Sequence, residues 1–376
     1  MRIRVPIAPV FLVLGSVAIA LVVLEAAARI MDGVPLLSTE NFVARSLDAI
    51  HTGGASVYDA KTGWVQAANR SAKMGPFIFT TGAYGVRMPT EEIRPLPEGA
   101  VLVVGDSFAV GSEVPNGSPW PAQLERMIGQ PVINAAVGGF APDQTVLRAE
   151  ELVPRLRPRV LLVELAAHFS MVTSYSVYGG APKPYFTIEN GALVRQNDPV
   201  PRRATSVSEI GWLRGIFGYS YLTYFTMVRT NSLQWWVAGE LQYKREYDND
   251  EALQVTCLLL KRLAALRDQY GIRVGIVVEH GGPFALDPAL PWYAKRVDDC
   301  AMDQKFELVD AFNALHAIYE ERGLEAYFRL WIMHDNNRAY GHMSDEGNRL
   351  IATLVAAKFF ASPSAEVPGL NDHHSP

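Results

Sequence analysis

Cysteine is scarce in this chain, since only Cys257 and Cys300 occur among 376 residues. Neither belongs to a C-x-x-C pair or has a histidine nearby, which argues against a zinc site or a thioredoxin-like redox motif. Cys257 falls in an apolar stretch with helical spacing, so two buried thiols are one interpretation. A disulfide formed in an oxidising compartment is the other, and the sequence leaves both open.

Long blocks of lysine and arginine are also missing. Charged residues make up 19% of the chain, and the formal net charge is -5. This composition excludes the basic footprint of a nucleic-acid-binding protein and a polybasic membrane surface. A P-loop and a dinucleotide-binding fingerprint do not occur either. We therefore expect no cofactor, no metal and no nucleic-acid partner, while a hydrophobic content of 49% predicts a sizeable folded core.

The first 30 residues (1–30) predict a membrane anchor. An apolar run from about Val5 to Leu24 has the roughly twenty residues that a helix needs to cross the hydrocarbon core of a bilayer. Arg2 and Arg4 precede the run, so the positive-inside rule places the body of the protein in the periplasm or outside the cell. A cleaved signal peptide is the alternative, with a cleavage site at 26–28, but the run exceeds the usual apolar region of about 7 to 15 residues.

The body divides into a lead-in with short strands (31–98), an α/β domain (99–362) and a flexible tail (363–376). Within the domain, buried aliphatic runs alternate with helical patterns, with Ser118 and Ser344 as expected helix caps. The expected strands are 100–104, 131–134, 159–165, 273–279 and 306–309, and the expected helices are 118–128, 143–156, 250–270, 290–303 and 345–360. This alternation predicts a central parallel sheet covered by helices.

An aromatic-rich insertion covers about residues 170–245. It includes the turn Glu189-Asn-Gly191, which predicts a hairpin joining 185–188 to 192–195. We expect the insertion to lie over the site, with its aromatic side chains mainly packed inside the protein. Stacking of these rings on sugars is the alternative.

The segment from Val101 to Gly111 holds the strongest candidate for chemistry. Its aliphatic residues predict a buried strand that ends sharply at Gly105, which places Ser107 at the carboxyl edge of a parallel sheet, where open α/β folds bind ligands. No G-x-S-x-G elbow surrounds this serine. A serine hydroxyl needs a neighbouring base before it can act as a nucleophile. Among the 8 histidines, His342 is the best candidate, because it lies directly before the terminal helix that Ser344 can cap.

Gly105-Asp106-Ser107 near the start of the domain, and His342 followed by Gly347 near its end, resemble the SGNH, or GDSL-type, hydrolases. That family contains esterases, lipases, deacetylases and polysaccharide O-acetyltransferases with a flavodoxin-like, three-layer α/β fold, and it has membrane-anchored bacterial members. The resemblance covers roughly residues 57 to 360. It implies that Ser107 is the nucleophile and His342 the general base. It also implies that Gly139, or else Gly138, donates its N–H to the oxyanion together with the N–H of Ser107.

Two positions depart from the family pattern. The segment after the third strand lacks the usual oxyanion asparagine, and His168 stands there instead; we expect it to fill a structural pocket, with donation to the oxyanion as the alternative. Ala339 replaces the usual aspartate three residues before the histidine. Either Asp335, the nearest acid upstream, orients His342, or a backbone carbonyl does so in a Ser-His dyad. Arg87 is expected to support the fold near the site.

These residues predict a membrane-anchored, extracytoplasmic serine esterase that cleaves acyl or acetyl esters of small molecules or polysaccharides. Two alternatives remain. A polysaccharide O-acetyltransferase would pass the acetyl group from Ser107 to a sugar hydroxyl, and a catalytically weakened carbohydrate-binding or assembly protein would explain the missing asparagine. The choice of acceptor depends on the exclusion of water, which a sequence does not show.

Overall fold

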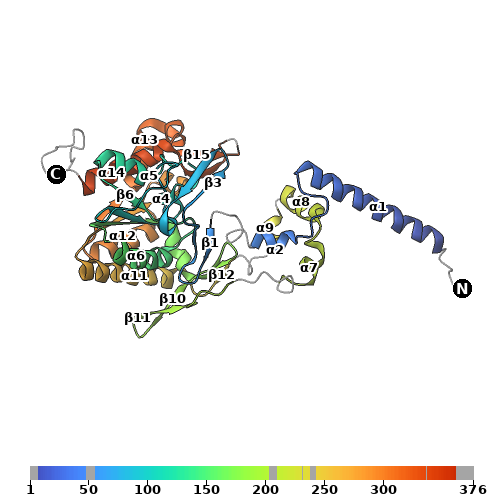
Figure 1. The fold of residues 1–376 in the computed structure, drawn as a ribbon, viewed down its shortest axis with the longest axis horizontal. Helices are drawn as coiled ribbons and strands as arrows, with labels where there is room; N and C mark the ends of the chain where they lie inside the picture. Colours follow the sequence, from blue (N-terminus) through green and yellow to red (C-terminus); the bar gives the residue numbers. More distant parts are fainter. Residues whose placement is uncertain are drawn as a thin grey trace. The chain divides into compact units, whose positions relative to one another are not determined.

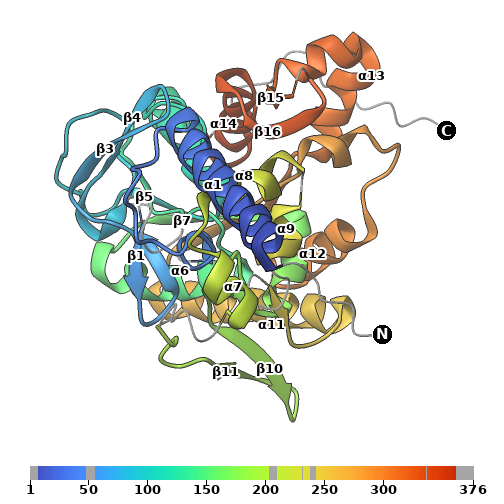
Figure 2. The same cartoon turned by 90° about the vertical axis from the view of Figure 1, so that its right-hand side faces the viewer.

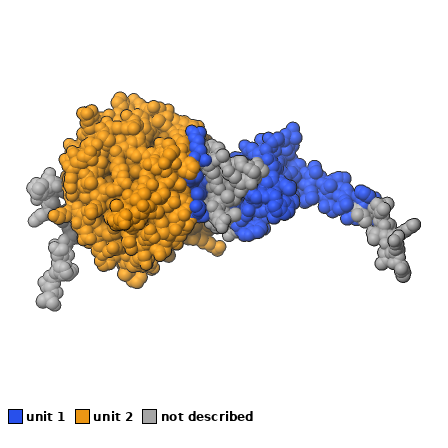
Figure 3. All heavy atoms as spheres, turned by 90° about the horizontal axis from the view of Figure 1, so that it is seen from below, with its two compact units in different colours: residues 1–53, 177–182, 202–244 blue, residues 54–176, 183–201, 245–376 orange. Residues whose placement is uncertain are grey.

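A computed structural model describes residues 7–47, 56–202, 210–230, 232–237, 243–335 and 337–360. The chain forms two compact units, which we describe separately (Figure 3). Unit 1 contains residues 1–53, 177–182 and 202–244, and unit 2 contains residues 54–176, 183–201 and 245–376. Arg2, Arg4 and the predicted tail lie outside the described residues.

Unit 2 is built on a five-stranded parallel sheet. Its strands are β5 (Val101–Val104), β6 (Val132–Asn134), β7 (Val160–Ala166), β13 (Arg273–Glu279) and β14 (Glu307–Asp310). They lie in the order β14-β13-β7-β5-β6, and every neighbouring pair is parallel. Numbered along the chain, this is the flavodoxin-like order 2-1-3-4-5. The predicted fold class is confirmed, and each strand lies where its aliphatic run predicts it.

Side chains of the strands alternate between two cores, one on each face of the sheet. Leu102, Val104 and Leu161 face the core that α6 (Pro142–Leu156), α11 (Asn249–Tyr270) and α12 (Trp292–Asp303) cover. Val103 and Leu162 face the core that α5 (Trp120–Ile128) and α14 (Asp345–Phe359) cover. Figure 1 shows the two helical layers on opposite sides of the sheet. Burial of each aliphatic side chain contributes about 1.5–3 kcal/mol, so the sequence pattern determines the layers.

Short strands precede the sheet, as the sequence predicts. β1 (Ser56–Asp59) pairs with β2 (Gly63–Gln66), and β3 (Arg70–Met74) pairs with β4 (Phe77–Thr81), both antiparallel. A 3₁₀ turn, η1 (Ala83–Gly85), follows. The predicted hairpin is also confirmed, since β10 (Tyr185–Glu189) pairs with β11 (Ala192–Gln196) (Figure 2).

Several elements are not predicted from the sequence. They are α4 (Ser107–Val110), η2 (Ala167–Ser174), η3 (Gly282–Leu286), α13 (Phe312–Phe328), β15 (Trp331–His334) and β16 (Ala339–Met343). β15 and β16 form an antiparallel hairpin that ends directly before α14. The short strands β8 (Tyr175–Tyr178), β9 (Ala181–Pro182) and β12 (Lys244–Arg245) lie near the points where the chain passes between the units.

The two predicted helix caps have different outcomes. Ser344 caps α14, because its Oγ accepts a hydrogen bond from the N–H of Gly347 at 3.3 Å. The expected cap at Ser118 is wrong, because Pro119 takes an extended conformation at the N-cap position and moves the start of α5 to Trp120. Ser118 instead accepts a hydrogen bond at its backbone carbonyl from the Gln123 amide.

Unit 1 contains α1 (Ile7–Met31), α2 (Phe42–Leu47), α7 (Trp212–Phe217), α8 (Tyr221–Arg229) and α9 (Leu233–Val237). The stretch Phe11–Met31 of α1 is long and apolar enough to cross a membrane. Much of the aromatic-rich insertion also belongs to this unit, whereas its hairpin β10–β11 belongs to unit 2. The insertion is therefore divided between two compact bodies.

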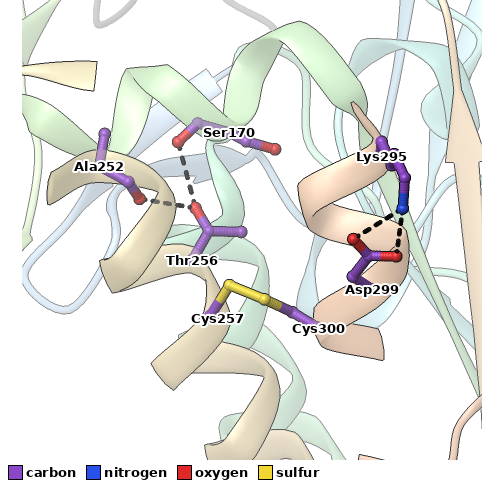
Figure 4. Close-up of a disulfide and its surroundings, with 7 residues drawn as sticks. All are labelled: Ser170, Ala252, Thr256, Cys257, Lys295, Asp299 and Cys300. Carbon is purple, nitrogen blue, oxygen red and sulfur yellow. Dashed lines mark hydrogen bonds and ion pairs between the residues drawn. A yellow bond between two sulfur atoms is a disulfide. The ribbon is translucent and has the colours of Figure 1, made fainter. Parts of the chain in front are cut away.

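Cys257 and Cys300 form a disulfide that joins α11 to α12 (Figure 4). This selects one of the two interpretations that the sequence leaves open. Both helices cover the same face of the sheet, so the bond fastens two neighbours in one layer. Disulfides of this structural kind form in oxidising compartments.

Replacing both cysteines, as Cys257→Ser with Cys300→Ser, is expected to destabilise unit 2. The bond closes a loop across a sequence separation of 43 residues. A disulfide of this span stabilises the folded state by about 2–4 kcal/mol, because it lowers the entropy of the unfolded chain. The melting temperature of the full chain in detergent should fall by about 5–10 °C. A reducing agent should lower the melting temperature of the wild type and leave the double variant unchanged. Equal melting of both proteins under oxidising conditions would contradict the expectation.

Candidate active site

Ser107 lies directly beyond the carboxyl end of β5, as the first residue of α4. β5 and β7 are neighbours at the point where the strand order reverses, which is where ligands bind in folds of this topology. Asp106 caps the short helix, because its carboxylate accepts a hydrogen bond from the N–H of Phe108 at 2.8 Å. The strand and the cap together hold Ser107 at the edge of the sheet.

The glycine before this turn is required by close packing. A Cβ at position 105 would lie 2.3 Å from Oε2 of Glu164, a residue of the neighbouring strand β7. The same Glu164 oxygen accepts a hydrogen bond from the N–H of Asp106 at 2.8 Å. A buried carboxyl group thus supports the turn from below and leaves room only for glycine.

His342 lies in β16, and its acid partner is Glu113. The Nδ1 of His342 is 2.6 Å from Oε2 of Glu113, and the backbone N–H of His342 donates to the same oxygen at 2.7 Å. The other oxygen of Glu113 is 2.8 Å from Nε2 of His334. Partial burial opposes ionisation of Glu113, but the hydrogen bonds from His342 and His334 outweigh it and lower the pKa of the carboxyl group. An ionised carboxylate only accepts, so a hydrogen of His342 lies on Nδ1, and Nε2 is the nitrogen that faces away from this contact.

The structure gives Asp335 a different place from the expected one. Asp335 lies in the turn between β15 and β16, where His334 pairs with Ala339. Its backbone is left-handed, with φ of 51°. Among the described residues no hydrogen bond joins Asp335 to His342, whose Nδ1 contacts Glu113. The hairpin register places Asp335 in the turn, and the carboxylate that contacts His342 comes instead from the loop that follows α4.

Gly341 makes this contact possible. A Cβ at this position would lie 2.7 Å from Oε2 of Glu113 and 2.6 Å from Nε2 of His334. Any side chain would therefore occupy the space in which Glu113 reaches the two histidines. The glycine before His342 is as much a part of the arrangement as the carboxylate.

α4, which begins with Ser107, packs against β16, the strand that contains His342. Phe108, the residue after Ser107, meets the His342 ring edge-on with 5.6 Å between the ring centroids. In the part of the chain that the structure describes, no hydrogen bond joins the Ser107 hydroxyl to His342. Catalytic hydrogen bonds commonly tighten only when substrate binds.

The two candidate glycines for the oxyanion lie in the loop after β6. The N–H of Val137 donates to the carbonyl of Gly105 at 3.0 Å, so this loop runs beside the nucleophile turn. A Cβ on Gly138 would be 4.0 Å from Cβ of Ser107. Gly139 has φ of 78°. Within the described ranges, the N–H groups of Ser107, Gly138 and Gly139 donate to no other protein atom, so the geometry keeps both glycines as candidates.

His168 follows β7 at the position of the missing asparagine. Its ring lies between Phe108, Phe169 and Phe284, with centroids 6.3, 4.9 and 5.3 Å away. Burial, with a smaller contribution from His280, lowers the pKa of His168 to about 4, so the imidazole is neutral at physiological pH. Its Nδ1 is buried without a hydrogen-bond partner among the described residues. The aromatic surroundings fit the expected structural pocket.

A buried guanidinium holds the segment between Ser107 and Glu113. Arg87 donates to the backbone carbonyls of Val110, Gly111 and Val114, and it lies 4.4 Å from the centroid of the Phe79 ring. Burial lowers the pKa of Arg87 to about 9, which still leaves it charged at neutral pH. The expectation that Arg87 supports the fold near the site agrees with these contacts.

Three buried carboxyl groups lie beneath the nucleophile. Burial raises the pKa of Asp106 to about 6 and that of Glu279 to about 8. Burial and the neighbouring Asp106 and Glu279 raise the pKa of Glu164 well above its usual range. The raised pKa values of Glu164 and Glu279 favour their protonated, neutral forms, which lets both side chains be buried in the core.

The fold and these residues define an α/β protein with a serine, a histidine and a glutamate assembled at the carboxyl edge of a parallel sheet. No family model and no curated protein matches the sequence. Similar solved structures include the acetyl xylan esterase AlAXEase, at 12% identity and a TM-score of 0.36 over 68% of this chain and 98% of the esterase. Axe2, an acetylxylan esterase from Geobacillus stearothermophilus, is 12% identical with a TM-score of 0.39 over 72% of this chain and 98% of its own. Esterase EstA from Pseudoalteromonas sp. is 11% identical with a TM-score of 0.36 over 69% of this chain and 96% of the esterase. At such low identities and TM-scores, the chemistry of the site is inferred from this chain's own residues.

The buried carboxyl cluster predicts how stability depends on pH. Because the folded state raises the pKa of Glu279 from 4.5 to about 8, the folded state holds a proton that the unfolded chain releases. This stabilisation is complete below the unfolded pKa and is lost as the pH rises through the folded pKa. The melting temperature of the wild type should therefore fall between pH 5 and 8.

Glu279→Gln tests this, because a glutamine keeps the shape and cannot ionise. The variant is expected to melt several degrees above the wild type at pH 8 to 9 and to show a flatter pH dependence. Glu98→Gln, at an exposed position, serves as the control and should follow the wild type. Identical pH profiles for all three proteins would show that the cluster does not hold its proton.

Proposed function

We propose that this chain is an SGNH-type ester hydrolase, anchored in a membrane by α1, that acts through an acyl-enzyme on Ser107. The observation that carries the proposal is the His342 Nδ1 to Glu113 contact of 2.6 Å, on a strand packed against the helix that begins with Ser107. An ionised acceptor on Nδ1 sets the imidazole in the tautomer that a general base needs. The location at the strand-order reversal of the sheet supports a ligand site there.

In the proposed reaction, Oγ of Ser107 bonds to the ester carbonyl carbon while its proton passes to Nε2 of His342. The negative charge that develops on the carbonyl oxygen is stabilised by the N–H groups of Ser107 and of Gly139 or Gly138. The bond to the alcohol breaks, and the alcohol leaves with the proton from His342. Water then adds to the acyl carbon, gives its proton to His342, and releases the acid as Ser107 recovers its hydrogen. Glu113 stabilises the positive imidazolium in both halves of the reaction.

A location outside the cytoplasm belongs to the same proposal. Two observations support it: the apolar helix α1 and the disulfide between Cys257 and Cys300, a bond that persists in oxidising compartments. Acyl or acetyl esters of small molecules or polysaccharides are the proposed substrates. The O-acetyltransferase alternative shares every step up to the acyl-enzyme and differs only in the acceptor.

The proposal is tested with the full chain in detergent micelles, supplied with p-nitrophenyl acetate alone or together with an oligosaccharide that can be acetylated. Ser107→Ala is expected to lose about 10³-fold or more in kcat, whereas Ser112→Ala, the next serine along the chain, should keep most of the activity. Acetylated sugar among the products would indicate a transferase. Equal rates for wild type and Ser107→Ala would reject both enzymatic functions.

The role of Glu113 is tested by Glu113→Gln, compared with Asp335→Asn. Loss of the negative charge on Nδ1 should lower kcat by about 10² to 10⁴ and leave KM nearly unchanged, because Glu113 acts on His342 rather than on the substrate. Asp335→Asn should behave like the wild type. A large loss in Asp335→Asn with normal activity in Glu113→Gln would reverse the assignment. Melting temperatures show whether either variant is folded.

A further inference from the structure

Helix α7 of unit 1 exposes an apolar side. Trp212, Leu213, Ile216 and Phe217 are 72%, 47%, 62% and 48% exposed. Positions i, i+1, i+4 and i+5 fall on one side of a helix, so these four side chains form a continuous surface. No residue of α7 is buried. Two aromatic and two aliphatic side chains gathered in this way form an exposed apolar patch, a feature that commonly marks an interaction site.

The opposite side of α7 is held in place by polar contacts. Nε of Arg214 donates to the carbonyl of Trp236 at 2.5 Å, and the amide of Asn41 donates to the carbonyl of Arg214 at 3.0 Å. The N–H of Phe42 donates to the carbonyl of Gly218 at 2.7 Å. These bonds join α7 to α2 and α9. The apolar side is therefore turned outward by the fold of unit 1.

The chain directly after α7 is fastened to the end of α1. Glu25, the first residue beyond the apolar run Val5–Leu24, accepts hydrogen bonds from the N–H groups of Tyr221 and Leu222, each at 2.8 Å. Arg29, one turn further, donates to the carbonyl of Tyr219 at 3.2 Å. At 1.5 Å of rise per residue, these contacts lie within about 8 Å of the last apolar residue of the run. That distance corresponds to the headgroup boundary of a bilayer that α1 would span.

We propose that the apolar side of α7 lies in the lipid headgroup boundary beside the point where α1 leaves the bilayer. The proposal rests on the proposed membrane anchor. Its occupant is lipid because the apolar run of α1 ends directly before Glu25 and its last side chains are themselves exposed, with Val23 at 61% and Leu24 at 52%. Tryptophan is enriched at this depth, where its apolar ring and its polar N–H both find suitable surroundings. Phenylalanine and leucine are common on the buried face of interfacial helices. Trp212, the most exposed of the four side chains, is the residue that we expect to contact lipid most extensively.

Leu36 and Leu37 are further exposed apolar side chains close to Arg29 in the chain. They are 56% and 93% exposed, and they follow Pro35, whose carbonyl accepts a hydrogen bond from Arg29 at 2.9 Å. The segment after α1 and the segment before α8 are thus both fixed to Arg29 and both carry exposed apolar side chains. Two separate stretches of sequence are thus fixed at one level of α1. We call the exposed apolar side chains of α7 together with Leu36 and Leu37 the interfacial collar, because they come from two segments rather than from a single amphipathic helix.

The experiment uses site-specific labelling of the full chain. Both native cysteines are in the disulfide, so one introduced cysteine is the only free thiol. Trp212→Cys is labelled with an environment-sensitive fluorophore and reconstituted in phosphatidylcholine and phosphatidylglycerol vesicles that contain lipids with a nitroxide at a shallow or a deep position. Leu14→Cys in α1 and Trp292→Cys, 58% exposed on α12 of unit 2, are the matched controls.

The label at 212 is expected to be quenched several-fold more by the shallow than by the deep nitroxide. The label at 14 should respond to the deep nitroxide and the label at 292 to neither. Quenching at 14 with a label at 212 that behaves like the one at 292 would overturn the collar and keep the anchor. A label at 14 that no nitroxide reaches would reject the anchor and the collar together. If the label at 212 becomes shielded from water as the protein concentration rises, and the nitroxide lipids do not quench it, a second copy of the chain covers α7 and the lipid contact is overturned.

Discussion

A buried guanidinium that has no carboxylate partner among the described residues holds the candidate site together. Arg87 donates to three backbone carbonyls between Val110 and Val114, and this short stretch joins the helix of Ser107 to Glu113. Carbonyl groups that turn away from a helix end need donors, and a planar guanidinium can serve several at once in fixed directions. The same residue donates its backbone N–H to the carbonyl of Asn134, at the end of β6. Through its side chain and its backbone, Arg87 thus joins the segment between Ser107 and Glu113 to the end of β6.

Beneath this arrangement, unusual polar residues occupy the core. Glu164 and Glu279 lie in β7 and β13, adjacent central strands whose other residues are mostly aliphatic. A carboxyl group is tolerated there because it keeps its proton, and Glu164 then supports the backbone of Asp106. The close contact of Glu164 with Gly105 explains why the turn before Ser107 begins with glycine. The buried Glu164 therefore serves to position the turn that carries Ser107.

Local sequence patterns were sufficient for the sheet and for two members of the site. Aliphatic runs predict the five strands because buried parallel strands need apolar side chains on both faces. Ser107 and His342 are recognisable because each lies beside a local signal, a strand end or a helix cap. Glu113 cannot be recognised in this way, because its contact with His342 spans 229 residues. The contact also depends on the β15–β16 hairpin, whose sequence has no strong periodicity. The expectation that the aromatic side chains of the insertion are mainly packed is met by Tyr221 and Trp236, which are buried, and not by Trp212 and Trp235, which are exposed. Composition does not separate rings that face a core from rings that face outward.

The pairing of Gly341 with Glu113 gives this site its own sequence signature. Because the carboxylate comes from the sixth residue after the serine and needs a glycine directly before the histidine, no acid is required in the neighbourhood of the histidine at all. A search for chains that share the arrangement would therefore look for G-D-S followed at that fixed spacing by glutamate, together with a distant G-H pair. Such a search would reach proteins that are passed over when an aspartate three residues before the histidine is taken as the mark of an intact site.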